Sequence, residues 1–573
     1  MHLRKWRKRV KGRTEEYWAL VESYRTARGP RQRIVAYLGE MAEASREGVA
    51  HAARGERAHQ PRLLEEGTPE WVEVDAKRLR VERVREFGGP WLGLEVMEKL
   101  GLGAFLRSVL PAGREEIPWA SMAQVLILGR LCDPSSELAL AERIYARTAL
   151  MDLLGVPAEK VNDDRLYRAL DALLPHQAAL EKHLKERLGS LFSLEYDLLL
   201  YDVTSTYFEG LAEGNELARR GYSRDHRPDC AQVCIALVVS KEGMPLAHRV
   251  FAGNRSDVST VEAIVEVIEE QYGAADRIWV MDRGMVSEEN VAFLRARGRR
   301  YILGTPKSQL RRYEEHFGEG GWETVREGLE AKRCPGPEGE ETYLLCRSQE
   351  RRAKEEAMRS RFEQRLEEGL TKLEAACKAR KLTPVNVAAR VGRLLGKHTR
   401  AERLFTWEVR TQADGRALLS WQKREERREW ASLSEGCYVL RTNITHWSEE
   451  ALWRAYMQLT QAEAAFRIHK QDLSLRPIWH QKEDRVRAHI LVCFLAYVLW
   501  KALGLLCGRA GLGDEPRLVL EELSQIRTVD VVLPTKTGPE LRRRCVTQPT
   551  KHQAILLQRL GMTLPTHLKM REV

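Results

Sequence analysis

The order of short β-type and helical segments in residues 194–310 restricts the fold of this chain more than any other feature. Three segments rich in β-branched and aromatic residues come first: LEYDLLLYDVTSTYF, CAQVCIALVVS and PLAHRVFAG. The turn KEGMP joins the last two. A helical segment, VSTVEAIVEVIEEQYG, is followed by RIWVMD, SEENVAFLRARG and RYILGTP. This β-β-β-α-β-α-β order predicts an α/β core.

Two aspartates close apolar runs within this core. Asp202 ends the run LLLYD, and Asp282 ends the apolar run of RIWVMDRGM. The element order is that of an RNase H-like core, so we expect both carboxylates at the ends of neighbouring strands. Together with a third carboxylate on a helix, they could hold a pair of hard divalent cations. Such a site suits chemistry at phosphate.

The third carboxylate is Glu463, in the helical stretch YMQLTQAEAAFRIHK. At about 100° per residue, one stripe of this helix contains Tyr456, Leu459, Glu463, Phe466 and Lys470. An acid and an amine in such a stripe are costly to bury unless ions or phosphates meet them. A solvated surface stripe is the alternative, but the two strand-ending aspartates favour a functional site.

Composition indicates the partner and the compartment. The chain has 573 residues, 43% hydrophobic and 31% charged, which describes a folded globular protein. A net charge of +11 favours a polyanionic partner, although charge alone does not decide this. Because the carboxylates suit chemistry at phosphate and the chain is basic, we expect DNA as the partner. The ten cysteines are scattered, which fits a reduced cytoplasm better than a disulfide framework.

Two other patterns are weaker. His226, Cys230 and Cys234 have a faintly zinc-like spacing, but no fourth ligand follows nearby. Residues 488–507 approach the length of a membrane span, and His489 and Lys501 interrupt them. We therefore expect a buried core helix and no membrane association. The basic N-terminus has no apolar segment typical of a signal peptide.

Along the chain, composition and periodicity predict seven regions. The helical region could be a helix-turn-helix-like DNA-binding unit or an all-helical packing domain; we assign it to DNA binding. The regions are a basic N-terminal β-hairpin (1–41), a linker (42–89), the helical region (90–193), the first part of the RNase H-like core (194–310), an insertion subdomain (311–436), the second part of the core with the catalytic helix (437–512) and a C-terminal region (513–573).

Several separated motifs resemble one family. YDVTSTYF, GNRSD, VMDRGM, YVLRTN and the helix of pattern Y-x2-[R]-x3-E-x6-K occur in the order found in DDE transposases of bacterial insertion sequences that carry the Y-R-E-K signature. AYLGE and PSSELALAE extend the resemblance towards the N-terminus, and the long insertion stands where that family has one. Leu459 departs from the signature, because it occupies the position of the arginine.

The resemblance implies roles for individual residues. Asp202, Asp282 and Glu463 would form the catalytic triad, and Tyr456 and Lys470 would contact DNA near the scissile phosphate. Arg467, one turn after Glu463, is a possible substitute for the missing arginine. Arg283 and Lys307 flank the expected site and either bind phosphate or face solvent. Asp257 of GNRSD either orients a loop near the metals or caps a turn.

The implied chemistry uses two Mg²⁺ or Mn²⁺ ions about 4 Å apart, with Asp202 bridging them. The enzyme would cleave double-stranded DNA at the terminal inverted repeats of an element and join the 3′ ends to target DNA. A homodimer on DNA, one protomer per end, is implied as well. Two alternatives stay open: a metal-dependent nuclease without strand transfer, and an inactive DNA-binding relic.

Overall fold

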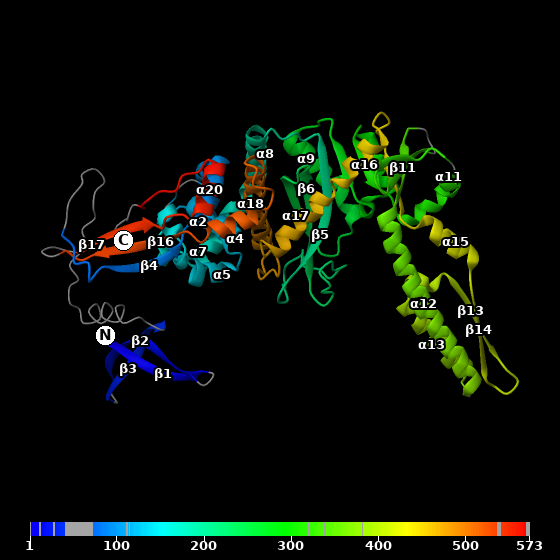
Figure 1. Ribbon diagram of the computed structural model, residues 1–573, viewed down its shortest axis with the longest axis horizontal. Coiled ribbons are helices and arrows are strands. Elements are labelled where there is room, and N and C mark those ends of the chain that lie inside the picture. Colours follow the sequence, from blue (N-terminus) through cyan, green and yellow to red (C-terminus); the bar gives the residue numbers. More distant parts are fainter. Residues whose placement is uncertain are drawn as a thin grey trace. The chain divides into compact units, whose positions relative to one another are not determined.

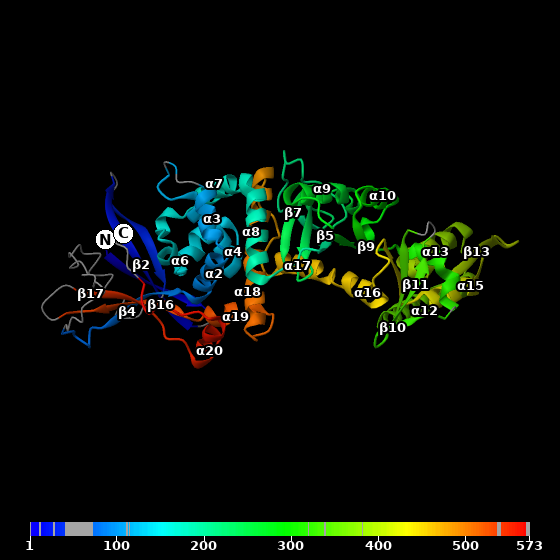
Figure 2. The same ribbon diagram turned by 90° about the horizontal axis from the view of Figure 1, so that it is seen from above.

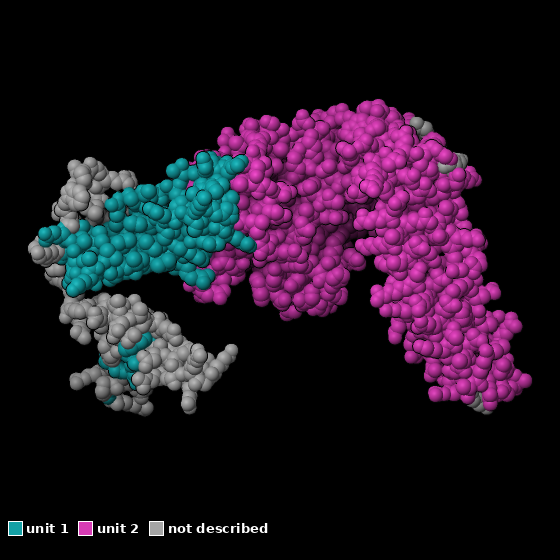
Figure 3. All heavy atoms as spheres, in the orientation of Figure 1, with its two compact units in different colours: residues 1–89, 146–157, 521–573 teal, residues 90–145, 158–520 magenta. Residues whose placement is uncertain are grey.

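The computed structural model describes residues 2–10, 13–26, 29–39, 73–110, 113, 115–318, 320–336, 340–380, 382–535 and 540–568. Contacts divide the chain into two compact units (Figure 3). The first comprises residues 1–89, 146–157 and 521–573, and the second comprises 90–145 and 158–520. Most of the predicted linker, residues 42–72, lies outside the described residues.

The N-terminal residues of the first unit form three antiparallel strands where the sequence predicted two. They are β1 (His2–Val10), β2 (Arg13–Thr26) and β3 (Gly29–Gly39), in the order β1-β2-β3. Lysine is depleted in strands, so the basic composition of β1 conceals its structure in the sequence. Pairing along the whole of β1 with β2 overrides that propensity.

A second sheet in this unit joins segments far apart in the chain. Its order is β17-β16-β4, built from β17 (Leu541–Val546), β16 (Arg527–Leu533) and β4 (Arg80–Glu86). The sequence assigned Arg80–Glu86 to a linker and did not show β17, because only the distant partner strand β16 stabilises each of them. Helix α20 (Lys551–Leu560) follows the sheet.

Helices make up the start of the second unit, as predicted. They include α2 (Gly88–Lys99), α3 (Leu102–Val109), α4 (Trp119–Cys132), α7 (Asp163–Leu173) and α8 (Gln177–Phe192). The long α18 (Glu483–Arg509) packs against α4 and α7, with α19 (Pro516–Leu523) after it. Among the described residues, α18 is the one helix long and apolar enough to cross a membrane, and 78% of its apolar window is buried in the protein. It therefore packs as a core helix, as predicted.

The core follows the predicted order of elements. The chain runs through β5 (Leu198–Tyr207), β6 (Gln232–Ser240), β7 (Pro245–Ala252), α9 (Val261–Tyr272), β8 (Ile278–Met281), α10 (Glu288–Ala296) and β9 (Arg300–Gly304). The strands among these elements belong to a nine-stranded sheet of order β10-β11-β12-β15-β9-β8-β5-β6-β7. Strand β8 runs parallel to β5 and β9, whereas β6 and β7 are antiparallel.

The beginning of the insertion corrects a prediction, because it extends this sheet. Strands β10 (Glu323–Arg326), β11 (Leu329–Pro335) and β12 (Thr342–Ser348) add to it through β15 (Cys437–Thr442), which pairs with β9. From the sequence, the first part of the sheet was predicted to end at residue 310. Short strands that carry charged residues, such as LEAKRCP, lack the apolar alternation that would reveal them.

The rest of the insertion has a core of its own. The long α12 (Gln349–Ala379), α13 (Pro384–Lys397), α14 (Thr399–Glu402) and the hairpin of β13 (Phe405–Thr411) and β14 (Ala417–Lys423) precede α15 (Glu425–Ser434) (Figure 1). Leu366, Leu370, Val387, Val391 and Leu419 are among its buried side chains.

Helices cover the two faces of the sheet differently. From above, α9 and α10 lie on one side of the central strands, and α16 (Glu449–Met457) and α17 (Thr460–Gln471) lie on the other (Figure 2). Tyr201 and Val203 pack into the core beneath α9. Because side chains alternate along a strand, Asp202 faces α17. The fold therefore turns this carboxylate towards the helix that carries Glu463.

Candidate active site

Asp202 lies in the middle of β5, among buried neighbours. Its Oδ1 accepts a hydrogen bond of 2.8 Å from the backbone N–H of Val203. Burial raises the pKa of Asp202 to about 7, although that hydrogen bond and the charge of Arg224 oppose the shift. The negative charges of Asp282 and Glu463 raise it further. The raised pKa means that an ionised Asp202 lacks sufficient positive charge nearby.

Asp282 follows the last residue of β8 directly. Tyr201 stands opposite Met281 in the parallel pairing of β5 and β8, so the next residue of each strand is an aspartate. Asp282 begins a short 3₁₀ turn over Arg283–Met285, and its Oδ1 accepts a hydrogen bond of 3.3 Å from the Tyr456 hydroxyl. The register of two parallel strands therefore places both carboxylates next to each other.

Glu463 lies in the first turn of α17, the helix that packs over β5. Burial raises its pKa, and the charge of Asp282 adds to the shift. Each of the three carboxylates thus interacts electrostatically with the other two. The structure brings together the three acids that the sequence singled out, from two strands and a helix.

The helical stretch predicted to carry Glu463 differs from its prediction in one respect. The sequence predicts one helix over Tyr456–Lys470, but the structure has two, because α16 ends at Met457 and α17 begins at Thr460. Tyr456 therefore reaches Asp282 from the end of α16. A Cβ on Gly304 would lie 2.4 Å from the Tyr456 hydroxyl oxygen, so only glycine leaves room for this contact.

An open cavity of about 390 Å³ adjoins the carboxylates. Asp282, Glu463 and Tyr456 line it, together with four cationic side chains: Arg283, Lys307, Arg326 and Arg351. Arg283 and Tyr456 were predicted to bind DNA, and both lie here. Lys307 also lies here, whereas Arg326 and Arg351 were not predicted from the sequence. These two belong to β10 and α12 of the insertion, more than a hundred residues from Glu463 in the chain, so no local motif indicates them.

Three of the four cationic side chains of the cavity contact neighbouring side chains. Lys307 pairs with Glu355 at 2.6 Å, and Arg351 donates to the same carboxylate at 3.3 Å. Arg326 lies over the Trp453 ring, 5.2 Å from its centre. The arrangement combines guanidinium groups with aromatic rings beside a carboxylate cluster. A phosphodiester strand could bind there through its phosphates and bases.

The other predicted DNA contacts lie elsewhere. Lys470 donates to Asp225 at 2.9 Å, and its side chain is only 10% exposed. Arg476 binds the same carboxylate, and burial lowers the pKa of Lys470. Arg467 is exposed on α17. With Leu459 buried in the arginine position, the detailed Y-R-E-K signature is not supported.

The three carboxylates suit divalent cations. Carboxylate oxygens are the preferred ligands of Mg²⁺ and Mn²⁺. Burial raises the pKa values of Asp202 and Glu463, the charges of the neighbouring carboxylates raise them further, and a bound cation would oppose both effects. The donor set therefore fits the metal chemistry that the sequence indicated.

A second cluster of possible metal ligands has a different explanation. Glu137, His480 and His489 bring ligand atoms within 4.8 Å of one another, and all three are buried. Arg130 lies 3.4 Å from the Glu137 carboxylate. Although burial alone would raise it, the two histidines and Arg130 hold the pKa of Glu137 well below its usual range. The guanidinium already neutralises this carboxylate, so we interpret the cluster as a buried ion-pair network.

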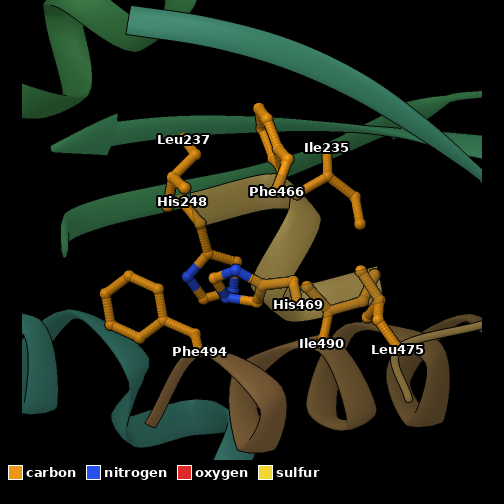
Figure 4. A pocket seen from close by; sticks show the side chains of 8 residues that line it. All are labelled: Ile235, Leu237, His248, Phe466, His469, Leu475, Ile490 and Phe494. Carbon is orange, nitrogen blue, oxygen red and sulfur yellow. The ribbon is translucent and has the colours of Figure 1, made fainter. Parts of the chain in front are cut away.

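A small cavity beneath α17 is too small to hold a substrate. His248 and His469 lie side by side in it, with Phe466 and Phe494 among the lining residues (Figure 4). Its volume of about 10 Å³ holds no more than about one water molecule. Burial lowers the pKa of His469 to about 4, so this ring is neutral. His226, Cys230 and Cys234 do not form a metal cluster within the described residues.

Two family models match parts of this chain. A family model described as "Transposase DDE domain" matches residues 193–499, more than half of the chain. A second, "IS1634 family transposase, N-terminal domain", matches residues 3–67. No curated protein matches. Among solved structures, a cryo-EM structure of the piggyBac transposase synaptic complex with hairpin DNA aligns with 8% identity and a TM-score of 0.35, over 79% of this chain and 82% of that one.

Proposed function

The chain belongs to the DDE transposases. We propose that it is an IS1634 family transposase and that Asp202, Asp282 and Glu463 are its catalytic triad. The enzyme transfers phosphoryl groups and binds DNA. The observation that carries the proposal is the placement of these three carboxylates: the register of β5 and β8 sets Asp202 beside Asp282, and Glu463 lines the same cavity as Asp282.

DDE transposases typically use divalent metal ions, and we propose that the triad holds two, Mg²⁺ or Mn²⁺. Asp202 would be the ligand that the two ions share. When bound, the ions would activate the attacking hydroxyl group and stabilise the leaving 3′ oxygen. Tyr456 holds Asp282 in place through its hydrogen bond, and the cationic side chains of the adjoining cavity would bind the phosphates of the strand.

The substrates we propose are the terminal inverted repeats of an insertion sequence and a target duplex, within the cytoplasm. The reaction is hydrolysis at the element end followed by transfer of the 3′-OH to target DNA. Cleavage and joining can use the same carboxylates, since both steps attack a phosphodiester with an oxygen nucleophile. A homodimer on DNA would present one triad to each element end.

Cleavage of labelled duplexes that carry the ends of the element tests this proposal. We expect Mn²⁺-dependent nicking by the wild type and a loss of at least about 100-fold in Asp282→Asn, which keeps the shape of the side chain. Asp276→Asn is the matched control. Asp276 lies two residues before β8, and its exposed side chain pairs with Arg300. Nicking without joining would instead indicate a nuclease. Tight end binding without nicking would indicate an inactive relic.

A further inference from the structure

The insertion contains a long stretch without acidic residues. Residues 375–401 include no Asp or Glu, although the chain as a whole has 82 acidic residues beside its 93 basic ones. Helix α13 lies within this stretch and carries Arg390, Arg393 and Lys397. None of these three side chains lines the cavity beside the carboxylates. The stretch therefore has an excess of positive charge that the cleavage site does not use.

The three cations form a stripe along one side of α13. On the other side, apolar residues at every fourth position from Val387 to Leu395 are buried in the core of the insertion. At about 100° per residue, Arg390, Arg393 and Lys397 fall within about 60° of one another, and all three are exposed. Packing of the apolar side therefore turns this cationic stripe towards solvent.

The cationic stripe has no acidic partner, unlike other cations of the insertion. Within the described residues, none of its three side chains forms an ion pair or a side-chain hydrogen bond. Acids of the adjacent α12 pair with other cations instead: Glu363 with Arg428, and Glu374 with Lys378. Like charges three or four residues apart on a helix repel one another. An anion lying along the stripe would relieve this repulsion, and a polyanion would do so at several positions at once.

Small residues beside the cationic stripe leave the backbone of α13 accessible. Ala389, Gly392 and Gly396 are exposed next to it, and a Cβ at either glycine would meet nothing within 4 Å. Glycine is among the least favourable residues inside a helix. Packing within the chain does not account for these two glycines, whereas a partner that approaches the helix closely would use the space they leave.

Helix α12 sets the distance between the cationic stripe and the carboxylates. Arg351, near the start of α12, lines the cavity beside Asp282. Helix α13 packs against α12 (Figure 1), and a Cβ on Gly369 would lie 2.8 Å from Leu394. At 1.5 Å per residue, α12 spans about 27 Å from Arg351 to Gly369. At about 3.4 Å per base pair, this corresponds to about 8 base pairs of duplex DNA.

We propose that the cationic stripe of α13 binds the phosphate backbone of duplex DNA, about 8 base pairs or more from the cleaved bond. The inference rests on the proposed function, because it takes the cleaved DNA as the partner. Guanidinium and ammonium groups bind phosphate oxygens without reading the sequence. The duplex on the stripe is the arm on the element side or the arm on the flanking side, and both offer the same phosphodiester chemistry.

Binding of a labelled element-end duplex at several salt concentrations tests the inference. Glutamine at all three positions of the stripe should lower the slope of log K against log salt concentration by about three, and the affinity about 100-fold near 0.15 M salt. The matched control removes three exposed cations of the insertion that do pair with acids: Lys378→Gln, Arg410→Gln and Arg416→Gln. An unchanged slope in the stripe variant would overturn the inference. So would an equal loss in the control, because the effect would then come from net charge.

Trimming the duplex shows which arm lies on the stripe. The difference between the wild type and the stripe variant should disappear once that arm is shorter than about 8 base pairs. A difference that survives the trimming of either arm would overturn the inference. If the stripe variant does not fold, Arg393→Gln alone should lower the slope by about one. Cleavage by Asp282→Asn at the wild-type rate would refute the proposed triad and leave the slopes as a valid test of the stripe.

Discussion

Replacing Asp202 by asparagine should stabilise the metal-free protein at neutral pH. Burial raises the pKa of this carboxyl group from 3.8 to about 7 in the folded state. For an acid, such a shift means that the folded state binds the proton more tightly than the unfolded state. The ionised side chain therefore costs stability, and this cost grows as the pH rises from about 4 to about 7.

The size of the effect follows from the shift. About three pKa units correspond to about 4 kcal/mol at the upper end. Asp202 is not fully enclosed, so solvent screening reduces this figure, and we expect about 2 kcal/mol above pH 7. Asparagine keeps an oxygen that can accept the Val203 hydrogen bond. The substitution therefore removes the charge and little else.

Denaturant unfolding, followed by tryptophan fluorescence in the absence of divalent cations, measures the difference. Asp202→Asn should be more stable than the wild type at about pH 8, and the two should converge towards about pH 4. Mn²⁺ should stabilise the wild type above pH 7 but stabilise Asp202→Asn far less. Asp276→Asn, at an exposed acid, should show neither effect. A less stable Asp202→Asn at pH 8 would refute the reasoning, because the carboxylate would then make net favourable contacts.

Three further predictions concern neighbouring residues. Gly304→Ala should reduce the cleavage rate at least about tenfold, because the added methyl group displaces the Tyr456 hydroxyl. The double variant Gly304→Ala with Tyr456→Phe should regain thermal stability but not full activity. An unchanged cleavage rate in Gly304→Ala would contradict the contact between Gly304 and Tyr456. Glu137→Gln should lower the free energy of unfolding in denaturant by about 3 kcal/mol, because the charge of Arg130 is then buried without a counter-charge. A decrease of less than about 1 kcal/mol would contradict the ion-pair network. Lys470→Met should lower the free energy of unfolding by about 2 kcal/mol, because Lys470 pairs with the buried Asp225. The salt dependence of binding to the element ends should stay unchanged. A decrease of about one in the slope of log K against log salt concentration would show a phosphate contact instead.

The sequence predicted the core well where local pattern and chemistry coincide. The apolar runs that end at Asp202 and Asp282 are short, β-rich and bounded by turns, so their strands and order could be read directly. Glu463 stood out because an acid interrupts an apolar stripe. The interruption of the helix between Met457 and Thr460 could not be seen, since residues on both sides keep helical spacing.

What the sequence by itself determined are the three acids, the secondary structure that carries them and the basic character that favours DNA. Only the tertiary structure decided which cations accompany them. Strand β10 and helix α12 bring Arg326 and Arg351 to the cavity, and Asp225 pairs with Lys470. Periodicity reports only neighbours within a strand or helix, whereas these pairs form between segments whose proximity depends on how the whole sheet assembles.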